Sequence, residues 1–367
     1  MFIFAKVVNI LAMQTFVKMS VRIVELPLRH AFVIAHGRRT VQRNVIVSLA
    51  DGSHSGYGEV APVPYYGVTA EGIAEALEKS RSSIEGTAFT DPPQFWREMF
   101  IALGGNRFAL CAIDEAAHDL WGKRLGNRVF ELWGLPQVDR PLSNYTIGID
   151  TIDRMLAKMN EFPGWPIYKI KLGTAADVGI IRQLRQKSDA VFRVDANTAW
   201  SAGEAIENSK LLRPLGVEFI EQPLKIDDWD GMRRVFQESA LPVIADESCV
   251  VEDDIEKCAG CFHGVNVKLT KAGGLTPAKK MAIRARELGL KVMAGCMTES
   301  TVGISSIAQL LPLLDYVDLD GAMLLGKDIA DGVRLDMGRV VFPKTNGCGA
   351  ELYESDFFST DNQKNAI

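Results

Sequence analysis

Ile-Tyr-Lys-Ile-Lys-Leu at residues 167–172 and Ala-Val-Phe-Arg-Val-Asp at residues 190–195 are two of eight short apolar runs that decide the fold. Each run is followed by a segment of helical period, about a dozen residues long. The remaining runs are residues 145–149, 217–221, 242–246, 264–269, 290–295 and 315–320. Their C-terminal ends recur at steps of 22 to 27 residues, the length of one strand and one crossover helix. Eight such units predict a parallel α/β barrel of the TIM type.

An open, doubly wound parallel sheet is the alternative to a closed barrel. Such a sheet normally carries a glycine-rich phosphate-binding turn after its first strand. No turn of that kind follows residues 145–149. The sequence therefore favours the barrel.

The chain before the barrel has a different pattern of apolar residues. Residues 21–26 and 44–49 are strand-like, and residues 106–123 carry alanine and leucine at helical spacing. These stretches predict an α+β domain. Because Met13 and Met19 both precede the first strand pattern, residues 1–18 are interpreted as an N-terminal extension of uncertain status.

Composition narrows the class of protein. The 367 residues are 47% hydrophobic and 24% charged, with a net charge of −5 and no block of like charges. This balance favours a small-molecule partner over nucleic acid or a membrane surface. Since no apolar run approaches the roughly 18 to 20 residues that span a bilayer, and no secretory signal is evident, we expect a cytoplasmic protein.

One cysteine pair has the spacing of half a zinc or redox site, Cys258-Ala-Gly-Cys261. A closed structural zinc site needs four ligands, and the sequence holds no second pair. We expect reduced, mostly buried thiols instead.

Charged residues end five consecutive barrel strands. A buried parallel strand normally reads as uninterrupted apolar sequence, so a charge at its end needs a reason. The five, in chain order, are Lys171, Asp195, Glu221, Asp246 and Lys268. In a barrel these strand ends meet at one mouth, where such folds place their active sites.

The three carboxylates form an all-oxygen set of ligands. Such a set selects a hard cation, and Asp195, Glu221 and Asp246 are therefore predicted to bind Mg²⁺. Mg²⁺ leaves positions open for a substrate carboxylate and stabilises the negative charge that appears when the adjacent carbon loses its proton. The site predicts enolisation of a carboxylate-bearing substrate.

The two flanking lysines, Lys171 and Lys268, fit the roles of base and acid on opposite sides of such an enolate. A free lysine has a pKa of about 10.4, too high for a base at neutral pH. A neighbouring divalent cation and a second ammonium group both lower the pKa of a lysine.

Strand alternation indicates which other side chains share the cavity. Lys169 lies two residues from Lys171 and points to the same side, where it could donate to the substrate or form a salt bridge inside the barrel. Asn197 is predicted to support the metal ligands. Glu247 is expected on the opposite face from Asp246, as a supporting group or part of the barrel wall.

A family resemblance rests on five motifs. They are Lys169-Ile-Lys171, Asp195-Ala-Asn197, Glu221-Gln-Pro223, Asp246-Glu247, and Lys268 within NVKLTKAGG. Together they resemble the muconate-lactonizing subgroup of the enolase superfamily. The resemblance implies a modified (β/α)₇β barrel at residues 141–325, a capping domain at residues 19–140, and a segment at residues 326–358 that returns to the cap.

The eighth strand narrows the resemblance. Asp318-Leu-Asp320 resembles the paired aspartates with which dipeptide epimerases hold the ammonium end of a dipeptide. Two carboxylates opposite a metal that takes the substrate carboxylate would suit a short zwitterion. The resemblance further implies that Thr146 and Lys169 contact that carboxylate, and that Met297 and Thr298 line the side-chain pocket.

The residues that would set substrate specificity depart from the pattern of the family that this sequence resembles. The Ala-Glu epimerases read glutamate with an arginine in a cap loop, and Gly37 occupies that position here. Arg38 and Arg39 are the alternative candidates for the pocket, or solvated loop charges. Tyr65 and Tyr66 could form the second cap loop over the site.

Three hypotheses follow. The first is an isomerase, a Mg²⁺-dependent dipeptide epimerase acting at the α-carbon next to the carboxylate by 1,1-proton transfer. The second is another enzyme of the subgroup: an N-acylamino acid racemase, a succinylbenzoate synthase or a cycloisomerase. The third is a non-catalytic binding protein, whose signature would be a lost metal ligand, and none is missing. The sequence leaves a homo-oligomer open.

Overall fold

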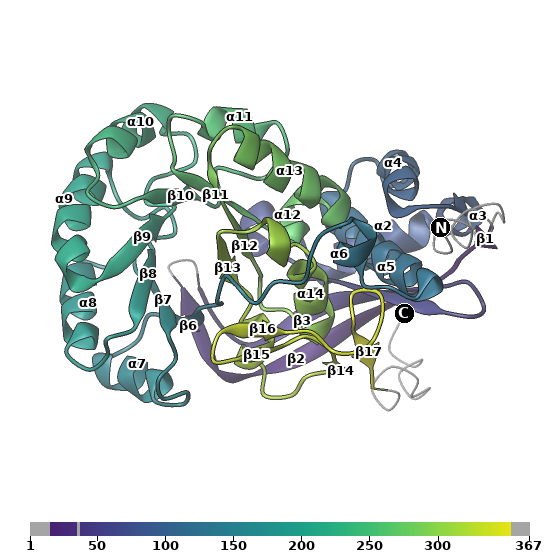
Figure 1. Cartoon of the computed structure of the whole chain (residues 1–367), viewed down its shortest axis with the longest axis horizontal. Helices are drawn as coiled ribbons and strands as arrows, with labels where there is room; N and C mark the ends of the chain where they lie inside the picture. The colour runs from purple at the N-terminus through teal and green to yellow at the C-terminus, as the bar shows by residue number, and fades with distance from the viewer. Residues whose placement is uncertain (1–14, 35–36, 354–367) are drawn as a thin grey trace.

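A closed parallel barrel forms the larger part of the structure, a computed structural model that describes residues 15–34 and 37–353 (Figure 1). Eight strands lie in one sheet in chain order. They are β6 (Tyr145–Ile147), β7 (Ile167–Lys171), β8 (Val191–Asp195), β9 (Val217–Glu221), β10 (Val243–Ala245), β11 (Gly264–Val267), β12 (Lys291–Gly295) and β13 (Tyr316–Asp318). A parallel bridge between Ser143 and Val317 joins the two edges. The barrel prediction is confirmed, and the open doubly wound sheet is excluded.

Helices follow each of the first seven strands, as a (β/α)₇β barrel requires. They are α7 (Ile152–Met159), α8 (Asp177–Arg185), α9 (Ala202–Leu212), α10 (Trp229–Glu238), α11 (Asp254–Cys258), α12 (Leu269–Ala272) with α13 (Leu275–Glu287), and α14 (Thr301–Ala308). Short 3₁₀ turns occupy Arg213–Leu215, Leu311–Leu313 and Gly321–Leu324. Local sequence fixes some helix starts: Ser201 and Glu204 form a reciprocal capping box at α9.

Apolar side chains close the bottom of the barrel. Phe219, Ile244 and Met293 pack together against Tyr316. The guanidinium of Arg193 lies 5.3 Å from the ring centre of Phe219 and 5.2 Å from that of Tyr316. Side chains fill this end, and the cavity lies at the opposite end, where the strands terminate.

The N-terminal region builds a separate antiparallel sheet. Its strands are β2 (Lys18–Ile34), β3 (Gly37–Ala50) and β4 (Ser55–Val60), and its helices are α2 (Ala70–Lys79), α3 (Arg81–Gly86), α4 (Pro92–Ala102), α5 (Arg107–Leu125) and α6 (Val129–Leu132). Strand β4 lies directly on α5. A Cβ atom at Gly56 or Gly58 would come within 2.2 or 2.1 Å of a backbone oxygen of that helix. Glycine is required there by the close approach of the two backbones.

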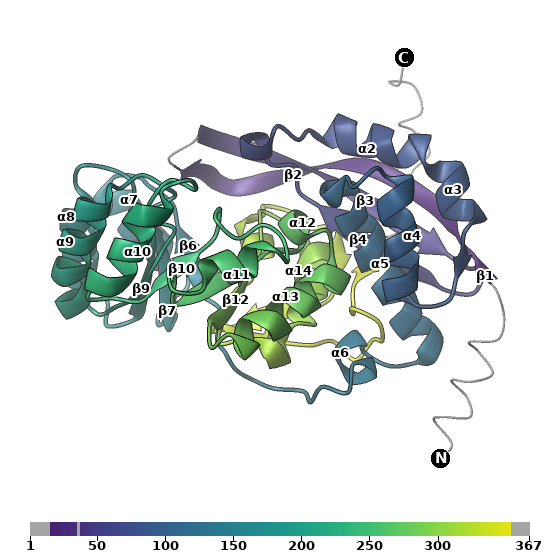
Figure 2. The ribbon, with the colours of Figure 1, turned by 90° about the horizontal axis from the view of Figure 1, so that it is seen from above.

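The β2–β3 hairpin extends from the capping helices over the barrel (Figure 2). Arg29 Nε donates to the carbonyl of Leu325 at 2.9 Å, and His30 Nε2 lies 2.6 Å from a carboxylate oxygen of Glu161. These contacts tie the hairpin to the last turn of the barrel and to the loop after α7.

Residues 15–18, at the end of the predicted extension, form part of the described fold. Strand β1 (Thr15–Phe16) pairs with β5 (Ala88–Phe89), Val17 is fully buried, and β2 begins at Lys18. The sequence predicts the first strand at residues 21–26, whereas β2 begins at Lys18. Residues 1–14 lie outside the described part of the chain.

The C-terminal segment runs back along the capping helices. Its strands are β14 (Ala330–Asp331), β15 (Arg334–Asp336), β16 (Arg339–Val341) and β17 (Glu351–Leu352). The Cys348 amide donates to Asp119 of α5 at 2.7 Å, and the Val129 amide donates to the Gly347 carbonyl at 3.1 Å. The domain boundaries at residues 140 and 325 stay a prediction, and residues 354–358 lie outside the described chain.

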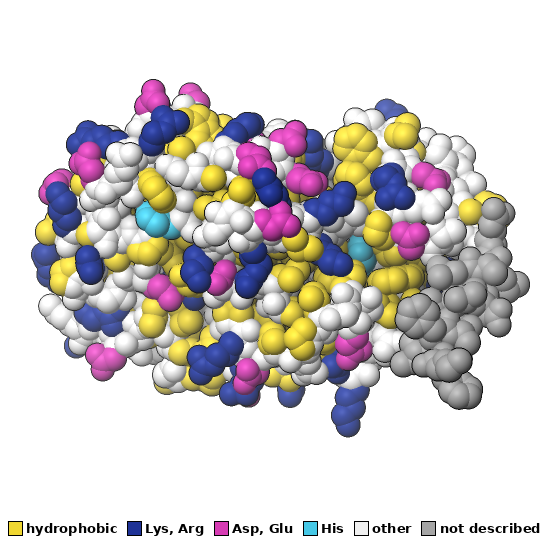
Figure 3. Space-filling model, turned by 45° about the horizontal axis from the view of Figure 1, so that its top comes forward, with side chains coloured by type: hydrophobic (Ala, Val, Ile, Leu, Met, Phe, Trp, Pro, Cys, Tyr) yellow, Lys and Arg dark blue, Asp and Glu magenta, His cyan; other side chains and the backbone are white. Residues whose placement is uncertain are grey.

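Charges of both signs are mixed over the face shown in Figure 3. Among the described residues, no helix is both long and apolar enough to cross a bilayer. The expected cytoplasmic location and the expected lack of nucleic-acid partners stay predictions.

Candidate active site

A cavity of about 790 Å³ opens at the C-terminal ends of the barrel strands, beneath the cap. Its barrel wall includes most of the site residues predicted from the sequence, although Asp195 and Glu221 are fully buried and do not line it. The predicted residues on this wall are Thr146, Lys169, Lys171, Asn197, Asp246, Glu247, Lys268, Met297, Thr298, Asp318 and Asp320. The cap contributes Arg39, Gln42, Tyr65 and Tyr66, among others. The two tyrosine rings pack edge to face with their centres 5.1 Å apart.

Three buried carboxylates form one cluster at this mouth. Asp195, Glu221 and Asp246 each offer an oxygen, and the three oxygens lie within 4.8 Å of one another. Strand register brings them together, because Asp195 pairs with Glu221 and Asp246 follows the end of β10. Burial, and then the charge of Asp195, raises the pKa of Glu221 to about 7. This crowded set of oxygens fits a divalent hard cation, which would relieve the repulsion.

Lys169 lies among these carboxylates. Its Nζ is 2.8 Å from Glu221, 3.2 Å from Asp195 and 2.9 Å from Asp318, and its side chain is 3% exposed. Burial alone would lower the pKa of Lys169, but the charges of Asp318, Glu221 and Asp195 outweigh it and hold that pKa well above its ordinary value. The structure shows the internal salt bridge predicted for Lys169, and donation from Lys169 to the substrate stays a prediction.

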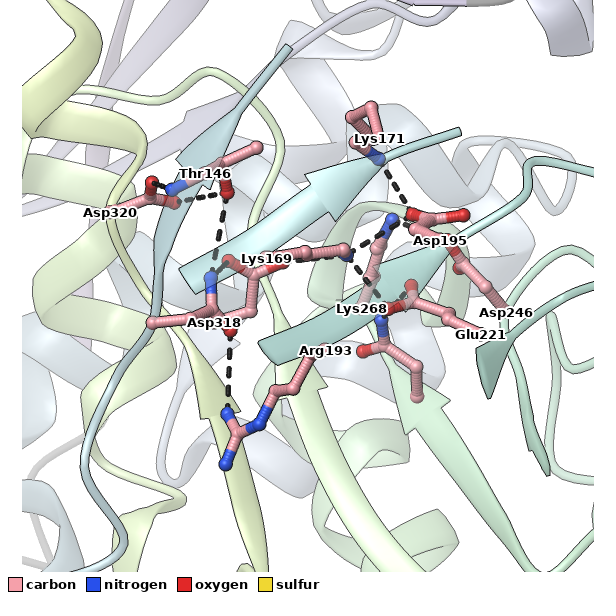
Figure 4. Close-up of polar contacts among 12 residues, drawn as sticks. Thr146, Lys169, Lys171, Arg193, Asp195, Glu221, Asp246, Lys268, Asp318 and Asp320 are labelled. Atoms are coloured by element: carbon pink, nitrogen blue, oxygen red, sulfur yellow. Dashed lines mark hydrogen bonds and ion pairs between the residues drawn. The ribbon is translucent and has the colours of Figure 1, made fainter. Parts of the chain in front are cut away.

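Lys171 and Lys268 occupy opposite sides of the cavity. Lys171 ends β7 and Lys268 follows β11, and three strands separate these two in either direction around the closed sheet. The Lys171 Nζ lies 2.6 Å from Asp195, and the Lys268 Nζ lies 2.7 Å from Asp246 (Figure 4). Each lysine therefore borders the carboxylate cluster from its own side.

Two aspartates form a second acidic group beside β6. Asp320 accepts hydrogen bonds from the Thr146 amide at 2.5 Å and the Thr146 hydroxyl at 3.2 Å (Figure 4). Asp318 accepts from Lys169 and from Asn144 Nδ2. Burial raises the pKa of Asp318, yet Lys169 outweighs it and brings that pKa to about 2. Burial, and then Asp318, raises the pKa of Asp320 to about 7. Lys158 offsets this rise only in part, which leaves room for the positive charge of a substrate ammonium.

Glu247 does not lie where strand alternation placed it. It lines the cavity together with Asp246 instead of facing away. Strand β10 ends at Ala245, so the alternation of a strand no longer governs residues 246 and 247. The Asn197 Nδ2 lies 3.4 Å from one Glu247 oxygen, and the other is buried without a hydrogen bond. Asn197 itself adopts a φ of 44°, which also departs from strand geometry.

Lys271 is a functional candidate that the sequence pattern missed. It is 2% exposed, and its Nζ lies 2.6 Å from Asp246 Oδ1 and 2.9 Å from the Cys249 carbonyl. It therefore fixes both the side chain of Asp246 and the loop that follows. The lysine sits on a helical turn, so its spacing resembles that of any surface lysine.

Replacing Lys271 by methionine should weaken Mg²⁺ binding by about tenfold or more, because supporting contacts of this kind orient the metal ligand. Asp246 keeps Lys268 as a partner at 2.7 Å, so the loss of its hydrogen bond from Lys271 should lower the free energy of unfolding by about 2 kcal/mol. Titration calorimetry with Mg²⁺ and denaturant unfolding measure the two effects. Lys257→Met, at an exposed lysine of α11, is the matched control. Unchanged Mg²⁺ affinity in the Lys271 variant would contradict this role.

The remaining sequence candidates divide into two groups. Arg39 lines the cavity and donates to Gln42 Oε1, whereas the Arg38 side chain lies outside the described residues. Cys258 and Cys261 are buried, free thiols, and neither belongs to a potential metal-binding group among the described residues.

A closed barrel with a carboxylate cluster between two opposed lysines defines a class of enzyme that moves protons on carbon beside a carboxylate. Two family models match the chain. The model described as mandelate racemase / muconate lactonizing enzyme, N-terminal domain, matches residues 17–134, and the one described as enolase C-terminal domain-like matches residues 152–356. The chain belongs to the enolase superfamily.

Its relatives narrow this assignment. An L-Ala-D/L-amino acid epimerase from Maribacter sp. is 53% identical over 91% of this chain and 99% of its own. An L-Ala-D/L-Glu epimerase from Bacteroides thetaiotaomicron is 37% identical over 89% of this chain and 85% of its own. The structure of a dipeptide epimerase from Cytophaga hutchinsonii, complexed with Mg and D-Ala-L-Val, is 26% identical with a TM-score of 0.87, covering 92% of this chain and 96% of that one. The chain falls in the dipeptide epimerase group.

Proposed function

We propose that this protein is a Mg²⁺-dependent dipeptide epimerase that inverts the α-carbon next to the substrate carboxylate. The observation that carries the proposal is the placement of Lys171 and Lys268 on opposite sides of the carboxylate cluster. Inversion requires removal of a proton from one face and its return to the other, so two opposed bases suit it. The names of the relatives support the same activity.

Each group of residues has a defined task in this proposal. Asp195, Glu221 and Asp246 would hold Mg²⁺, which supplies Lewis-acid stabilisation of the charge on the substrate carboxylate when bound. One lysine removes the α-proton and the other donates a proton to the opposite face. The surrounding cap, with Tyr65 and Tyr66 at the cavity, excludes water from the reacting carbon.

The protonation of Lys268 depends on its neighbour Asp246. Burial lowers the pKa of this lysine, but the charge of Asp246 outweighs burial and raises it. When Asp246 is engaged as a metal ligand, that attraction is weaker and the effect of burial is left. The same side chain can then accept a proton.

The acidic group of Asp318 and Asp320 supports binding of a substrate that has a free ammonium group. Asp320 lines the cavity, and its carboxylate accepts hydrogen bonds from Thr146. Arg38 and Arg39 stay proposed contacts of the substrate side chain, and Met297 and Thr298 stay proposed walls of its pocket. An N-acylated substrate would place a neutral or negative group against Asp320, which disfavours the racemase alternative.

Isotope exchange tests this function directly. With Mg²⁺ in D₂O, a library of L,L-dipeptides should show deuterium at the C-terminal residue's α-carbon together with epimerisation, and EDTA should stop both. Mass spectrometry and chiral chromatography report the two outcomes. N-succinyl and N-acetyl amino acids serve as the comparison set. Preferential turnover of those acylated substrates would favour the racemase alternative, and exchange that persists in EDTA would contradict the metal requirement.

A further inference from the structure

We propose that Asn44 is a positioning residue that joins the cap wall of the substrate cavity to its barrel wall and thereby sets side-chain selectivity. This inference rests on the proposed dipeptide epimerase function. Asn44 lies in β3 of the cap, outside the cavity lining, and is fully buried.

The side chain of Asn44 makes three hydrogen bonds, which use its whole amide group. Its Nδ2 donates to the Thr298 carbonyl at 2.9 Å and to Glu59 Oε1 at 2.7 Å. Its Oδ1 accepts from Gln42 Nε2 at 2.8 Å. A fully satisfied buried amide of this kind fixes the groups around it, because loss of any partner leaves another polar atom unpaired.

The partners of Asn44 reach the cavity from two directions. On the cap side, Gln42 lines the cavity and accepts a hydrogen bond from Arg39, which lines it too. On the barrel side, Met297 and Thr298 line the cavity in the loop between β12 and α14. A single run of hydrogen bonds, Arg39 to Gln42 to Asn44 to Thr298, therefore crosses from one wall to the other.

Glu59 of β4 holds the same barrel loop from behind. Its buried carboxylate accepts from the Ser300 amide at 3.0 Å, the Ser300 hydroxyl at 2.6 Å and the Gly303 amide at 2.9 Å. The two amides belong to the N-terminal end of α14 and have no partner within that helix. A residue of the cap therefore accepts the free amide hydrogen bonds of a barrel helix. Asn44 and Glu59 together leave the Thr298 backbone little freedom to move relative to the cap.

We expect the residues that position the cavity walls to act separately from the residues that transfer protons. The run of hydrogen bonds contacts neither Lys171 nor Lys268, whose nearest carboxylates are Asp195 and Asp246. Loosening it should therefore displace the walls that meet the substrate side chains and leave proton transfer intact. A changed KM and a changed preference among dipeptides, with kcat retained, is the signature of this role.

The test compares Asn44→Leu, which is similar in size without hydrogen bonds, with Gln42→Met, which cuts only the cap end of the run. Ser48→Ala, further along the same buried face of β3 and away from the cavity, is the matched control. Steady-state epimerisation of the dipeptide library with saturating Mg²⁺ gives KM and kcat for each substrate. Thermal unfolding of each variant reports whether it is folded.

We expect Asn44→Leu to raise KM by about tenfold, the effect of losing roughly 1.4 kcal/mol of binding, with kcat within about threefold. Preferences among side chains should flatten. Gln42→Met should change the preference through Arg39 even if Asn44→Leu does not fold. Wild-type KM and preference in the folded variants, or a fall in kcat as large as the rise in KM, would overturn the inference. A wild-type enzyme that exchanges no dipeptide would instead overturn the proposed function.

Discussion

Replacement of Lys268 by alanine is expected to abolish epimerisation while leaving α-proton exchange of one stereoisomer. Lys171 stays in place on β7, across the barrel from the vacated position. It can still remove a proton from the face that it borders and return deuterium to that same face. Exchange without inversion in D₂O is therefore the expected result, for the stereoisomer whose α-proton faces Lys171.

The expected loss of epimerisation is about 10²- to 10⁴-fold, the contribution of a general acid–base group. The variant Lys268→Arg distinguishes the effect of the positive charge at this position from the effect of proton transfer. Arginine keeps a cation beside Asp246 but does not lose its proton at neutral pH. Both variants should be inactive in epimerisation, and Lys257→Ala, at an exposed lysine, should resemble wild type.

The reciprocal variant, Lys171→Ala, should exchange the other stereoisomer and likewise fail to invert it. Proton NMR of the α-position follows exchange, and chiral chromatography follows inversion. Normal epimerisation by either alanine variant would show that one lysine, or water, suffices, and the two-base proposal would be wrong.

The strand-end residues could be predicted from the sequence because a strand of fixed period points alternate side chains one way. Asp195 and Glu221 end their strands, as predicted, and the structure shows that they pair in register. Glu247 could not be placed by the same rule, because β10 ends at Ala245 and the backbone beyond it follows the loop. Asn197, Lys268 and Asp320 also lie beyond the ends of their strands yet line the cavity as predicted, so the rule fails at Glu247 and not at every strand end.

Contacts between residues far apart in the chain could not be predicted from the sequence for a different reason. Asn44 and Thr298 are 254 residues apart, and nothing in either local pattern indicates that a cap strand meets a barrel loop. Arg193 did carry a signal, since a charge within an otherwise apolar strand needs a partner. The structure supplies Glu218 at 2.8 Å and the Val317 carbonyl at 3.1 Å. A charge of this kind in the sequence indicates a contact inside the barrel, but it does not identify the residue that forms the contact.

Replacement of Asp320 by asparagine is expected to lower kcat/KM for free dipeptides by about 100-fold. Asparagine keeps an oxygen that can accept from the Thr146 amide, so the local structure should survive. It removes the carboxylate charge, and a charge-assisted hydrogen bond contributes about 1.5 to 3 kcal/mol. Most of the loss should appear in KM, because the ammonium is bound equally before and during proton transfer.

The matched comparison is made on substrates instead of on a second protein variant. N-acetyl dipeptides have no ammonium for Asp320, so their low kcat/KM should be unchanged or higher in Asp320→Asn. The ratio of the two substrate classes therefore shifts by about 100-fold or more, a result that a general loss of structure cannot give. An equal fall for both classes would mean that Asp320 supports the fold through Thr146 and does not read the substrate amine.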